Sequence, residues 1–414
     1  MRDKNVLNVL VISDVHAHSQ DPRSSQTPSF YSTNSLFSDA GSNPLTDIPT
    51  IIKKHGLAVD WVLTPGDLGD RADPTSQKIA WEELEKIRQQ TGATLLIGTT
   101  GNHDIDSRRN FPEFDPKSAL QALKPMFPVS CSLFEENDGV YSDRFWSRNF
   151  VVIPFVEYDC TLVVLNSSAF HGYASDTKGP SREHLRGKIS PLTLEAIKKE
   201  LAGHNTRLNI VLLHHHLSKH PWIEDSDSFV IGGDKLSEYL KETGKQWLVI
   251  HGHQHVPHLS YADGTPLAPV VLSAGSVAAR TYDVRGVHPR NQIHHISVHL
   301  DDMDPSGAEV LGNITSWTWA VGSGWREASV DGGLPFKCGF GYRPSAIELR
   351  NKLVTAAKTA APGVHRWANV LSMDPKLQFL TSDDLAQVLS MVQQTGTVVD
   401  FDRHQLPEHL EWRE

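Results

Sequence analysis

The sequence predicts an α/β fold, and three observations support this prediction. Short apolar runs alternate with helix-like segments over the first half of the chain, as they do when strands and helices alternate. Most of the apolar runs end in a polar motif that contains Asp, Asn or His. The chain has 414 residues, of which 39% are hydrophobic, and this suits one large globular domain with an accessory segment, or two domains.

The predicted strands are short apolar runs bounded by polar residues. Residues 6–12 form too short a run for a signal peptide and lead directly into Asp14 and His16, so we interpret them as a buried strand. The same kind of run predicts strands at residues 60–64, 94–99, 150–155, 161–165, 209–213, 246–250, 270–273, 293–300 and 310–320.

The predicted helices show apolar residues at helical spacing together with start signals. The helix that begins near Pro74 places Trp81, Leu84 and Ile87 on one face. Ser190-Pro191 provides an N-cap and a first residue for another helix. The full set covers residues 45–55, 74–90, 191–201, 235–242, 344–361 and 382–395.

The remaining segments are expected to lack regular structure. Residues 19–43 are rich in Ser, Pro, Asn and Asp and predict a loop, which either borders the mouth of a site after Asp14 or is a disordered insertion. Residues 105–150 and Gly332–Gly341 are also expected to be irregular. We expect a main domain over residues 1–330, with 19–43 as a loop insertion. A C-terminal loop and helical extension over residues 331–414 would pack on it, cap it or mediate oligomerisation.

Charge, cysteine content and hydropathy disfavour nucleic-acid-binding, disulfide-rich and membrane-spanning proteins. The net charge is −10 and no block of Lys and Arg occurs, which disfavours a protein that grips long nucleic acid. The three cysteines form no CxxC pair, so neither a disulfide framework nor a cysteine-type zinc site is indicated, and a cytoplasmic protein is expected. No stretch is apolar enough to predict a transmembrane helix.

Five short motifs contain side chains that bind metals. In chain order they are Asp14-Val15-His16, Gly66-Asp67, Gly101-Asn102-His103-Asp104, His214-His215-His216 and His251-Gly252-His253-Gln254-His255. Residues two apart on an extended strand share a face, so Asp14 and His16 can reach one metal. Most of the motifs taken alone are also typical of ordinary turns and loops, and the metal-site interpretation depends on all five following predicted strands.

The third motif is expected to provide acid–base chemistry. Asn102 offers a neutral oxygen ligand, and the imidazole of His103 can act as a proton donor. Asp104 is expected to orient this imidazole and to hold it protonated. For the nearby Asp70 we expect an Asx-type turn or a salt bridge with Arg71.

Together the motifs provide seven candidate metal ligands. These are Asp14, His16, Asp67, Asn102, His214, His253 and His255. Two metals that share the Asp67 carboxylate, roughly 3.5–4 Å apart, would generate a nucleophilic hydroxide and clamp a phosphoryl group. The mixture of carboxylate, amide and imidazole groups suits two divalent or trivalent ions of Mn, Fe, Zn or Ni.

The set of motifs resembles the pattern of the calcineurin-like metallophosphoesterase superfamily, which is D-x-H, G-D-x-x-D, G-N-H-[DE], a His-containing strand end and G-H-x-H. The resemblance covers most of residues 8–280 and implies a four-layer α/β/β/α sandwich with the metals at the carboxyl ends of the strands. It implies one metal on Asp14, His16, Asp67 and His255, and the other on Asp67, Asn102, His214 and His253. His103 would protonate the leaving oxygen after attack by the bridging hydroxide.

The fourth motif departs from the family pattern, which often reads His-His-Pro or His-x-Pro. Aligning strand ends favours His214 as the ligand, with His215 in reserve and His216 in the usual Pro place. The triplet resembles bacterial class III cyclic-nucleotide phosphodiesterases. The predicted function is therefore hydrolysis of a phosphodiester, with a cyclic or other small nucleotide as substrate. The alternatives are a nuclease, a phosphomonoesterase, or a binding scaffold that has lost catalysis, although such scaffolds typically lose ligands.

Overall fold

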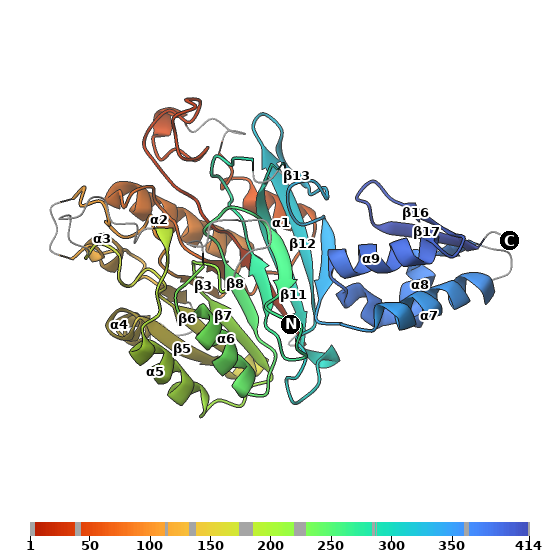
Figure 1. Cartoon of the computed structure of the whole chain (residues 1–414). Helices are drawn as coiled ribbons and strands as arrows, with labels where there is room; N and C mark the ends of the chain where they lie inside the picture. Colours follow the sequence, from red (N-terminus) through yellow and green to blue (C-terminus); the bar gives the residue numbers. More distant parts are fainter. Residues whose placement is uncertain are drawn as a thin grey trace.

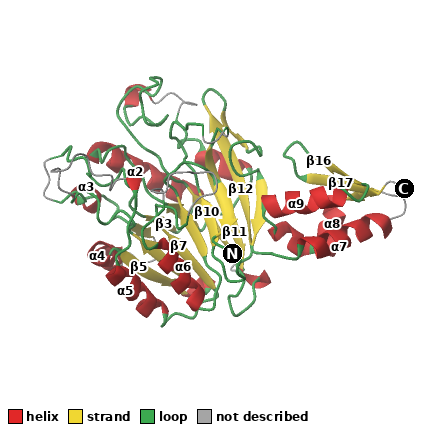
Figure 2. Cartoon of the chain, viewed as in Figure 1, coloured by secondary structure: helices red, strands yellow, loops and turns green. Residues whose placement is uncertain are grey.

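The computed structural model describes residues 5–37, 43–111, 115–131, 138–173, 185–218, 229–283, 286, 288–359 and 364–412. Two β-sheets lie face to face in the main body, and a smaller lobe formed by the C-terminal segment lies to one side of them (Figure 1). Figure 2 shows helices on the outer sides of the two sheets and long loops above them. No helix within these ranges is both long and apolar enough to cross a membrane.

The first sheet joins strands from both ends of the main body. Its order is β13-β12-β11-β1-β2-β3-β4, with β14 paired to β12. β1, β2 and β3 are parallel to one another, whereas β4, β11, β12, β13 and β14 pair antiparallel with their neighbours. The strands are β1 (Val6–Val11), β2 (Trp61–Thr64), β3 (Leu95–Gly98), β4 (Val129–Cys131), β11 (Asn291–His299), β12 (Gly312–Ala320), β13 (Gly324–Glu327) and β14 (Lys337–Phe340).

The second sheet has the order β5-β6-β7-β8-β10-β9, and β6, β7, β8 and β10 run parallel. Its strands are β5 (Phe150–Phe155), β6 (Cys160–Leu165), β7 (Leu208–Leu212), β8 (Leu248–His251), β9 (His258–Tyr261) and β10 (Val270–Ser273). Parallel strands covered on both faces read as continuous apolar runs, and this is why these segments were recognisable in the sequence.

The two sheets and their helices form four layers. Alternate residues of β7 enter different cores: Ile210 and Leu212 lie between the sheets, and Val211 lies under the helices of the second sheet. The outer helices are α1 (Ile48–Lys54) and α2 (Pro74–Thr91) on the first sheet, and α5 (Pro191–Leu201) and α6 (Gly233–Glu242) on the second. The predicted α/β/β/α sandwich is therefore confirmed.

The predicted helix starts have the expected caps. The side chain of Asp73 accepts a hydrogen bond of 3.0 Å from Thr75 N ahead of α2, and Ser190 Oγ accepts one of 3.0 Å from Thr193 N at α5. Both helices begin with a proline, whose missing N–H is not needed at that position.

Two segments predicted to be irregular contain regular structure. Residues 105–150 include α3 (Ser118–Gln121), β4 and α4 (Asp138–Arg148). Phe145 of α4 is fully buried 6.2 Å from the ring of Phe127, so a tertiary contact stabilises this short helix. Gly332–Gly341 includes β14, which forms because its backbone pairs with β12. Both predictions were wrong because short elements depend on partners far away in the chain.

The C-terminal lobe has its own small core, formed by Leu353, Val370, Val392 and Leu410 among others. Its elements are α7 (Ala346–Thr359), α8 (Trp367–Met373), α9 (Ser382–Gln393), β15 (Val364–Arg366), β16 (Thr397–Phe401) and β17 (Pro407–Trp412). The two predicted helices are present, and the three-stranded sheet was not predicted. β14 extends the first sheet beyond residue 330, so the predicted domain boundary there stays a prediction.

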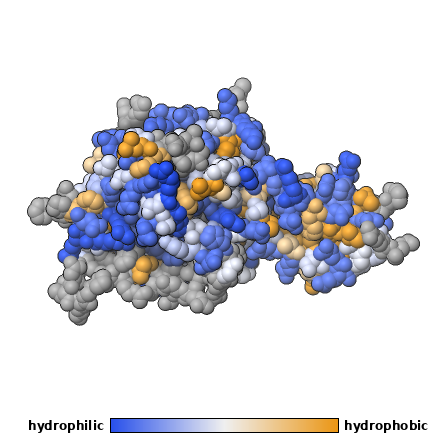
Figure 3. Space-filling view, turned by 90° about the horizontal axis from the view of Figure 1, so that it is seen from above, coloured by the Kyte–Doolittle hydropathy of each residue, from blue (hydrophilic) through white to orange (hydrophobic). Residues whose placement is uncertain are grey.

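The surface of this lobe differs from that of the main body. Seen from above, hydrophobic residues gather on the lobe at the right of Figure 3, whereas hydrophilic residues cover much of the main body. Ile347 and Met373 belong to the exposed apolar residues of this part, at 58% and 69%. Oligomerisation through the C-terminal segment stays a prediction.

The packing between the sheets can be tested at Trp61. Its side chain is 1% exposed and its ring lies 4.4 Å from that of Phe155 on the opposite sheet. We expect Trp61→Ala to lower the free energy of unfolding by about 3–5 kcal/mol, measured by denaturant unfolding, because it leaves a cavity between the sheets. Val156→Ala, at a residue 91% exposed, is the control and should change little. A small effect of Trp61→Ala would contradict this packing.

Candidate metal centre

All five motifs lie at the carboxyl ends of strands, on the same edge of the paired sheets. They follow β1, β2 and β3 of the first sheet and β7 and β8 of the second. Backbone hydrogen bonds join them directly: Asp14 N donates to Gly66 O over 3.1 Å, and Gly252 N donates to His214 O over 3.1 Å. Parallel strands place their carboxyl ends together, so motifs far apart in the chain meet here.

The backbone at the candidate ligands has an unusual conformation. Asp14, His16, Asp67, His253 and His255 have φ values of 51°, 47°, 55°, 85° and 57°. Residues other than glycine adopt this left-handed region at a cost of order 1–3 kcal/mol each. Five of the seven candidate ligands are strained in this way, which indicates that the orientation of these side chains costs folding free energy.

One group of ligands gathers around His16. Asp14, His16, Asp67 and His255 each offer an atom within 4.8 Å of the others. His16 Nε2 lies 2.9 Å from His255 Nε2 and 3.4 Å from Asp67 Oδ2, and His255 Nε2 lies 3.4 Å from Asp14 Oδ1. Two carboxylates and two imidazoles that converge in this way are a donor set suited to a transition metal.

A second group gathers around Asn102. Its side-chain oxygen lies 2.9 Å from His214 Nε2 and 3.0 Å from His253 Nδ1. His214 Nε2 is also 3.4 Å from Asp67 Oδ2. His214 Nδ1 donates to the carbonyl oxygen of Pro65 over 2.9 Å, which leaves Nε2 facing Asn102 and Asp67.

Asp67 links the two groups. Its Oδ2 is buried, has no hydrogen-bond partner among the described residues, and lies 3.4 Å from both His16 Nε2 and His214 Nε2. Its Oδ1 accepts a hydrogen bond of 2.8 Å from His103 N, which fixes the carboxylate. A buried carboxylate oxygen without a donor is costly unless a cation pairs with it, so these residues fit two metal ions that share Asp67.

The three histidines of the triplet have different surroundings. Only His214 faces Asp67 and Asn102 among the contacts of the described residues. His215 Nδ1 lies 2.8 Å from Ser167 Oγ, and the ring of His216 packs at 4.3 Å on that of His251. The choice of His214 from strand-end alignment agrees with this geometry, and its role as a metal ligand stays a proposal.

Two glycines allow the ligand carboxylates to approach the backbone. A Cβ on Gly101 would overlap the Asp67 carboxylate, and a Cβ on Gly252 would overlap that of Asp14. We expect Gly101→Ala to remove most bound metal, measured per chain by elemental analysis, because Asp67 must move. Gly264→Ala is the control, since nothing lies within 4 Å of a Cβ there. Full metal content in Gly101→Ala would contradict the assignment of Asp67.

His103 has a different carboxylate partner from the one predicted. His103 Nδ1 lies 2.8 Å from Asp70 Oδ1, and Asp70 lies 3.5 Å from Arg71 Nε through its other oxygen. The prediction that Asp104 orients His103 was wrong. Asp70 does so, and its predicted salt bridge with Arg71 is only a secondary contact. The G-D-x-x-D spacing contained the signal for Asp70.

Asp104 instead holds the turn that carries Asp67. Its carboxylate accepts hydrogen bonds from backbone amides of Asp67 and Gly101, both at 2.8 Å, and of Leu68 and Gly69, at 2.8 and 3.3 Å. Burial and the charge of Asp67 raise the pKa of Asp104 to about 6. Asp104 therefore points away from the His103 imidazole and stabilises the turn that carries Asp67.

The charges at the site suit cation binding. Burial lowers the pKa of His16 to about 3, so this imidazole is neutral at pH 7, as a ligand must be. Burial also opposes protonation of His214, but the charge of Asp67 outweighs it and raises the pKa of His214 to about 9. The negative potential of the buried carboxylates thus favours a positive charge between the two groups.

Two arginines lie beside His103 at the edge of the site. The side chain of Arg71 is 68% exposed. Arg108 is exposed as well, and it forms no ion pair with the described residues. Partial burial and the charge of Arg71 lower the pKa of Arg108, while the charge of Asp70 opposes this. Arg108 was not predicted as a site residue, because no motif contains it.

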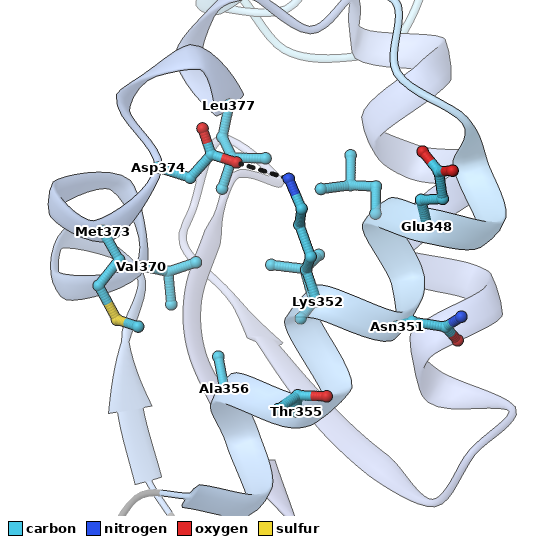
Figure 4. A pocket seen from close by; sticks show the side chains of 11 residues that line it. Glu348, Asn351, Lys352, Thr355, Ala356, Val370, Met373, Asp374 and Leu377 are labelled. Carbon is cyan, nitrogen blue, oxygen red and sulfur yellow. Dashed lines mark ion pairs between the residues drawn. The ribbon is translucent and has the colours of Figure 1, made fainter.

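A separate cavity lies in the C-terminal lobe, away from the candidate metal ligands (Figure 4). It has a volume of about 870 Å³ and is lined by residues of α7 and α8, with the apolar side chains of Leu353 and Val370 among them. An ion pair of 3.8 Å joins Lys352 Nζ to Asp374 Oδ2 beside it. The cavity is lined by none of the five motifs, so it is separate from the candidate metal centre.

Comparisons with known proteins give one family match and several similar solved structures. The family model for calcineurin-like phosphoesterases matches residues 7–257. No curated protein matches the chain. A dimetal phosphatase from Danio rerio is 13% identical with a TM-score of 0.47, over 75% of this chain and 95% of that one.

Two further solved structures are similar over about half of their own length. Purple acid phosphatase PPD1 from yellow lupin (Lupinus luteus) is 13% identical with a TM-score of 0.44, over 76% of this chain and 51% of that one. A putative 5'-nucleotidase from Staphylococcus aureus is 15% identical with a TM-score of 0.38, over 71% and 51%. The sequence match alone spans more than half of the chain. The protein therefore belongs to the calcineurin-like phosphoesterase family.

Proposed function

We propose that the protein hydrolyses a phosphodiester, with a cyclic or other small nucleotide as its substrate. Family membership supports a metal-dependent phosphoric ester hydrolase. The observation that best supports a two-metal site is Asp67 Oδ2, buried without a donor between His16 and His214. The preference for a diester is supported by the His triplet after β7, which resembles that of class III cyclic-nucleotide phosphodiesterases.

The proposed ligand sets follow the two groups of side chains. One metal is assigned to Asp14, His16, Asp67 and His255, and the other to Asp67, Asn102, His214 and His253. When bound, such a pair lowers the pKa of water and neutralises the phosphoryl oxygens. Mn, Fe, Zn and Ni all suit these ligands. Elemental analysis of protein purified without added metal identifies the ions that it retains.

His103 is proposed as the proton donor to the leaving oxygen. Asp70 accepts from Nδ1, which leaves Nε2 to deliver a proton. Burial lowers the pKa of His103, but the charge of Asp67 and the hydrogen bond to Asp70 outweigh this and raise it. The raised pKa favours the protonated form of His103, which a general acid requires. In this proposal Asp104 is a positioning residue for the Asp67 turn.

A phosphomonoesterase is the second candidate, favoured by the positive charges of Arg71 and Arg108 near His103. A phosphomonoester carries about one more negative charge than a diester at pH 7. Arg108→Ala should then lower the rate of hydrolysis of p-nitrophenyl phosphate more than that of bis-p-nitrophenyl phosphate. Arg326→Ala, at an exposed residue of β13, is the control and should change neither rate.

A substrate panel tests the proposal against its alternatives. The Mn-loaded protein is assayed with bis-p-nitrophenyl phosphate, p-nitrophenyl phosphate, cyclic nucleotides and single-stranded DNA. We expect the first compound and at least one cyclic nucleotide to be hydrolysed fastest. A faster rate on p-nitrophenyl phosphate would indicate a monoesterase, and a faster rate on DNA would indicate a nuclease. No hydrolysis by protein that holds two metals would indicate a binding scaffold.

A further inference from the structure

A second cavity lies at the same edge of the first sheet as the candidate metal ligands. It has a volume of about 380 Å³, within the roughly 300–1,000 Å³ typical of small-molecule sites. β11 runs antiparallel to β1, so its first residue, Asn291, lies at the end of β1 that leads to Asp14. The lining includes Phe30, Tyr282, Arg290, Asn291 and Trp319.

Two buried polar atoms of this lining have no hydrogen-bond partner in the part of the chain that the structure describes. They are Asn291 Oδ1, an acceptor, and Trp319 Nε1, a donor. The two residues are 6% and 4% exposed, and they are direct partners across the β11–β12 pairing. Buried polar groups are almost always paired in folded proteins. An unpaired donor and an unpaired acceptor on two paired residues therefore indicate a ligand that accepts from the one and donates to the other.

The rest of the lining provides aromatic surface and a cation. The ring of Phe30 lies 5.3 Å from that of Trp319, and the guanidinium of Arg280 lies 4.3 Å above Phe30. Tyr282 is 79% exposed at the rim. Arg290 is also exposed and pairs with no carboxylate among the described residues. Such a lining suits a flat ring with polar edges.

Phe30 is held in place by the loop that contains it. Phe30 N donates to Ala278 O over 2.8 Å. Arg280 donates from Nε to Thr27 Oγ1 over 3.1 Å and from Nη2 to the carbonyls of Pro22 and Ser24, at 2.6 and 2.8 Å. Residues 38–42 of the predicted 19–43 loop lie outside the described residues. Residues 22–30 are thus anchored to residues 278–280, between β10 and β11, and Ser25 and Phe30 form one wall of the cavity.

Hydrogen bonds connect both walls of the cavity to the candidate metal ligands. Ser29 Oγ, next to Phe30, donates to the carbonyl oxygen of His16 over 2.8 Å. On the other wall, Gln292 N, next to Asn291, donates to Ser276 O over 2.8 Å. Ser276 Oγ in turn donates to the carbonyl oxygen of Asp14 over 2.6 Å. A ligand in this cavity would lie beside the strand-end site.

We propose that this cavity binds the nucleobase of the substrate. A nucleobase is flat, stacks on aromatic rings, and presents an acceptor next to an N–H donor on its edge. Trp319 Nε1 donates to the base, Asn291 Oδ1 accepts from it, and Phe30 and Tyr282 contact its faces. Arg290 lies at the rim, where the ribose or a phosphate emerges. The proposal rests on the proposed function, and it assigns the base-recognition role to residues outside the metal ligands.

Nucleoside binding provides a test that does not depend on hydrolysis. Adenosine, guanosine, cytidine and uridine are titrated into the full-length protein by calorimetry, with ribose as the control ligand. We expect at least one nucleoside to bind and ribose not to bind. Trp319→Phe, which keeps a ring but removes the N–H, and Asn291→Ala should each weaken binding about tenfold, the effect of one lost buried hydrogen bond.

Matched variants keep the test interpretable. Trp325→Phe is the control for Trp319→Phe, because Trp325 Nε1 already donates to Pro44 O over 2.7 Å and does not line the cavity. If Trp319→Phe does not fold, Tyr282→Ala replaces it, since this residue is exposed and its loss should also weaken binding. Trp325→Phe should bind the nucleoside and hydrolyse bis-p-nitrophenyl phosphate as the wild type does.

The outcomes separate this proposal from the proposed function. Hydrolysis of bis-p-nitrophenyl phosphate without nucleoside binding, or equal nucleoside affinity in wild type and Asn291→Ala, would overturn the base site and leave the phosphoesterase intact. Nucleoside binding that depends on Asn291 and Trp319 without hydrolysis of any ester would overturn the proposed function and support the base site. A higher KM for a nucleotide substrate in Asn291→Ala, with kcat little changed, would support both.

Discussion

Asp67→Ala is expected to lose bound metal and hydrolytic activity together. Asp67 is the carboxylate shared by both candidate ligand groups, and its Oδ2 is the buried oxygen without a donor. Removing it leaves His16 and His214 without a common counter-charge. Because a metal pair contributes several kcal/mol of transition-state stabilisation, we expect the rate to fall by roughly 10³-fold or more. Elemental analysis per chain and rates on bis-p-nitrophenyl phosphate measure both effects.

The control for this variant is Asp263→Ala. Asp263 pairs with Lys241 over 2.6 Å, away from the ligand residues, and its removal should change neither metal content nor rate. Wild-type metal content in Asp67→Ala would show that the shared carboxylate is not a ligand. Retention of one metal per chain, with activity lost, would support Asp67 as a ligand of the other metal.

His103→Ala is expected to keep bound metal and lose turnover. A general acid contributes typically 10²–10⁴-fold, so we expect a loss of about that size on esters with poor leaving groups. The rate on p-nitrophenyl esters should fall less, because nitrophenolate leaves without a proton. His204→Ala, at a histidine after α5, is the control. Equal losses on both kinds of ester would count against a general-acid role.

The pH dependence of the Asp70 variant separates Asp70 from Asp104. The hydrogen bond to Asp70 raises the pKa of His103, and a general acid loses activity as the pH rises through its pKa. Asp70→Asn should therefore move the alkaline limb of the kcat profile to lower pH. Asp104→Asn should weaken metal binding instead, because Asp104 holds the Asp67 turn. An unmoved limb in Asp70→Asn would contradict the assigned pair.

Much of the site could be predicted because its parts are local. Asp14, Asp67 and Asn102 each follow a strand within a few residues, and a parallel sheet brings such positions to one edge. The helices after Pro74 and Ser190 were likewise predictable from their own caps. In these cases the determining contacts lie within about four residues of each other, and a single sequence contains them.

Other features depend on partners that periodicity does not reveal. β14 and α4 form because β12 and the buried Phe127 lie beside them, so they were missed as irregular segments. Asp104 follows His103 directly in the chain but bonds four amides of the neighbouring turns, whereas Asp70 reaches the imidazole. Adjacency in sequence therefore predicted the wrong carboxylate, because the turn decides where each side chain points.

By itself the sequence determined the α/β class, the seven candidate ligands and His103, because strand-end motifs encode them within a few residues. The tertiary structure decided which of His214, His215 and His216 faces Asp67. It also brought Asn291 opposite Trp319 and anchored Phe30 beside them. These contacts depend on the strand register and on the anchoring of the loop. They join residues up to 289 positions apart, from Phe30 to Trp319. Close packing between residues so far apart is decided only when the whole chain folds.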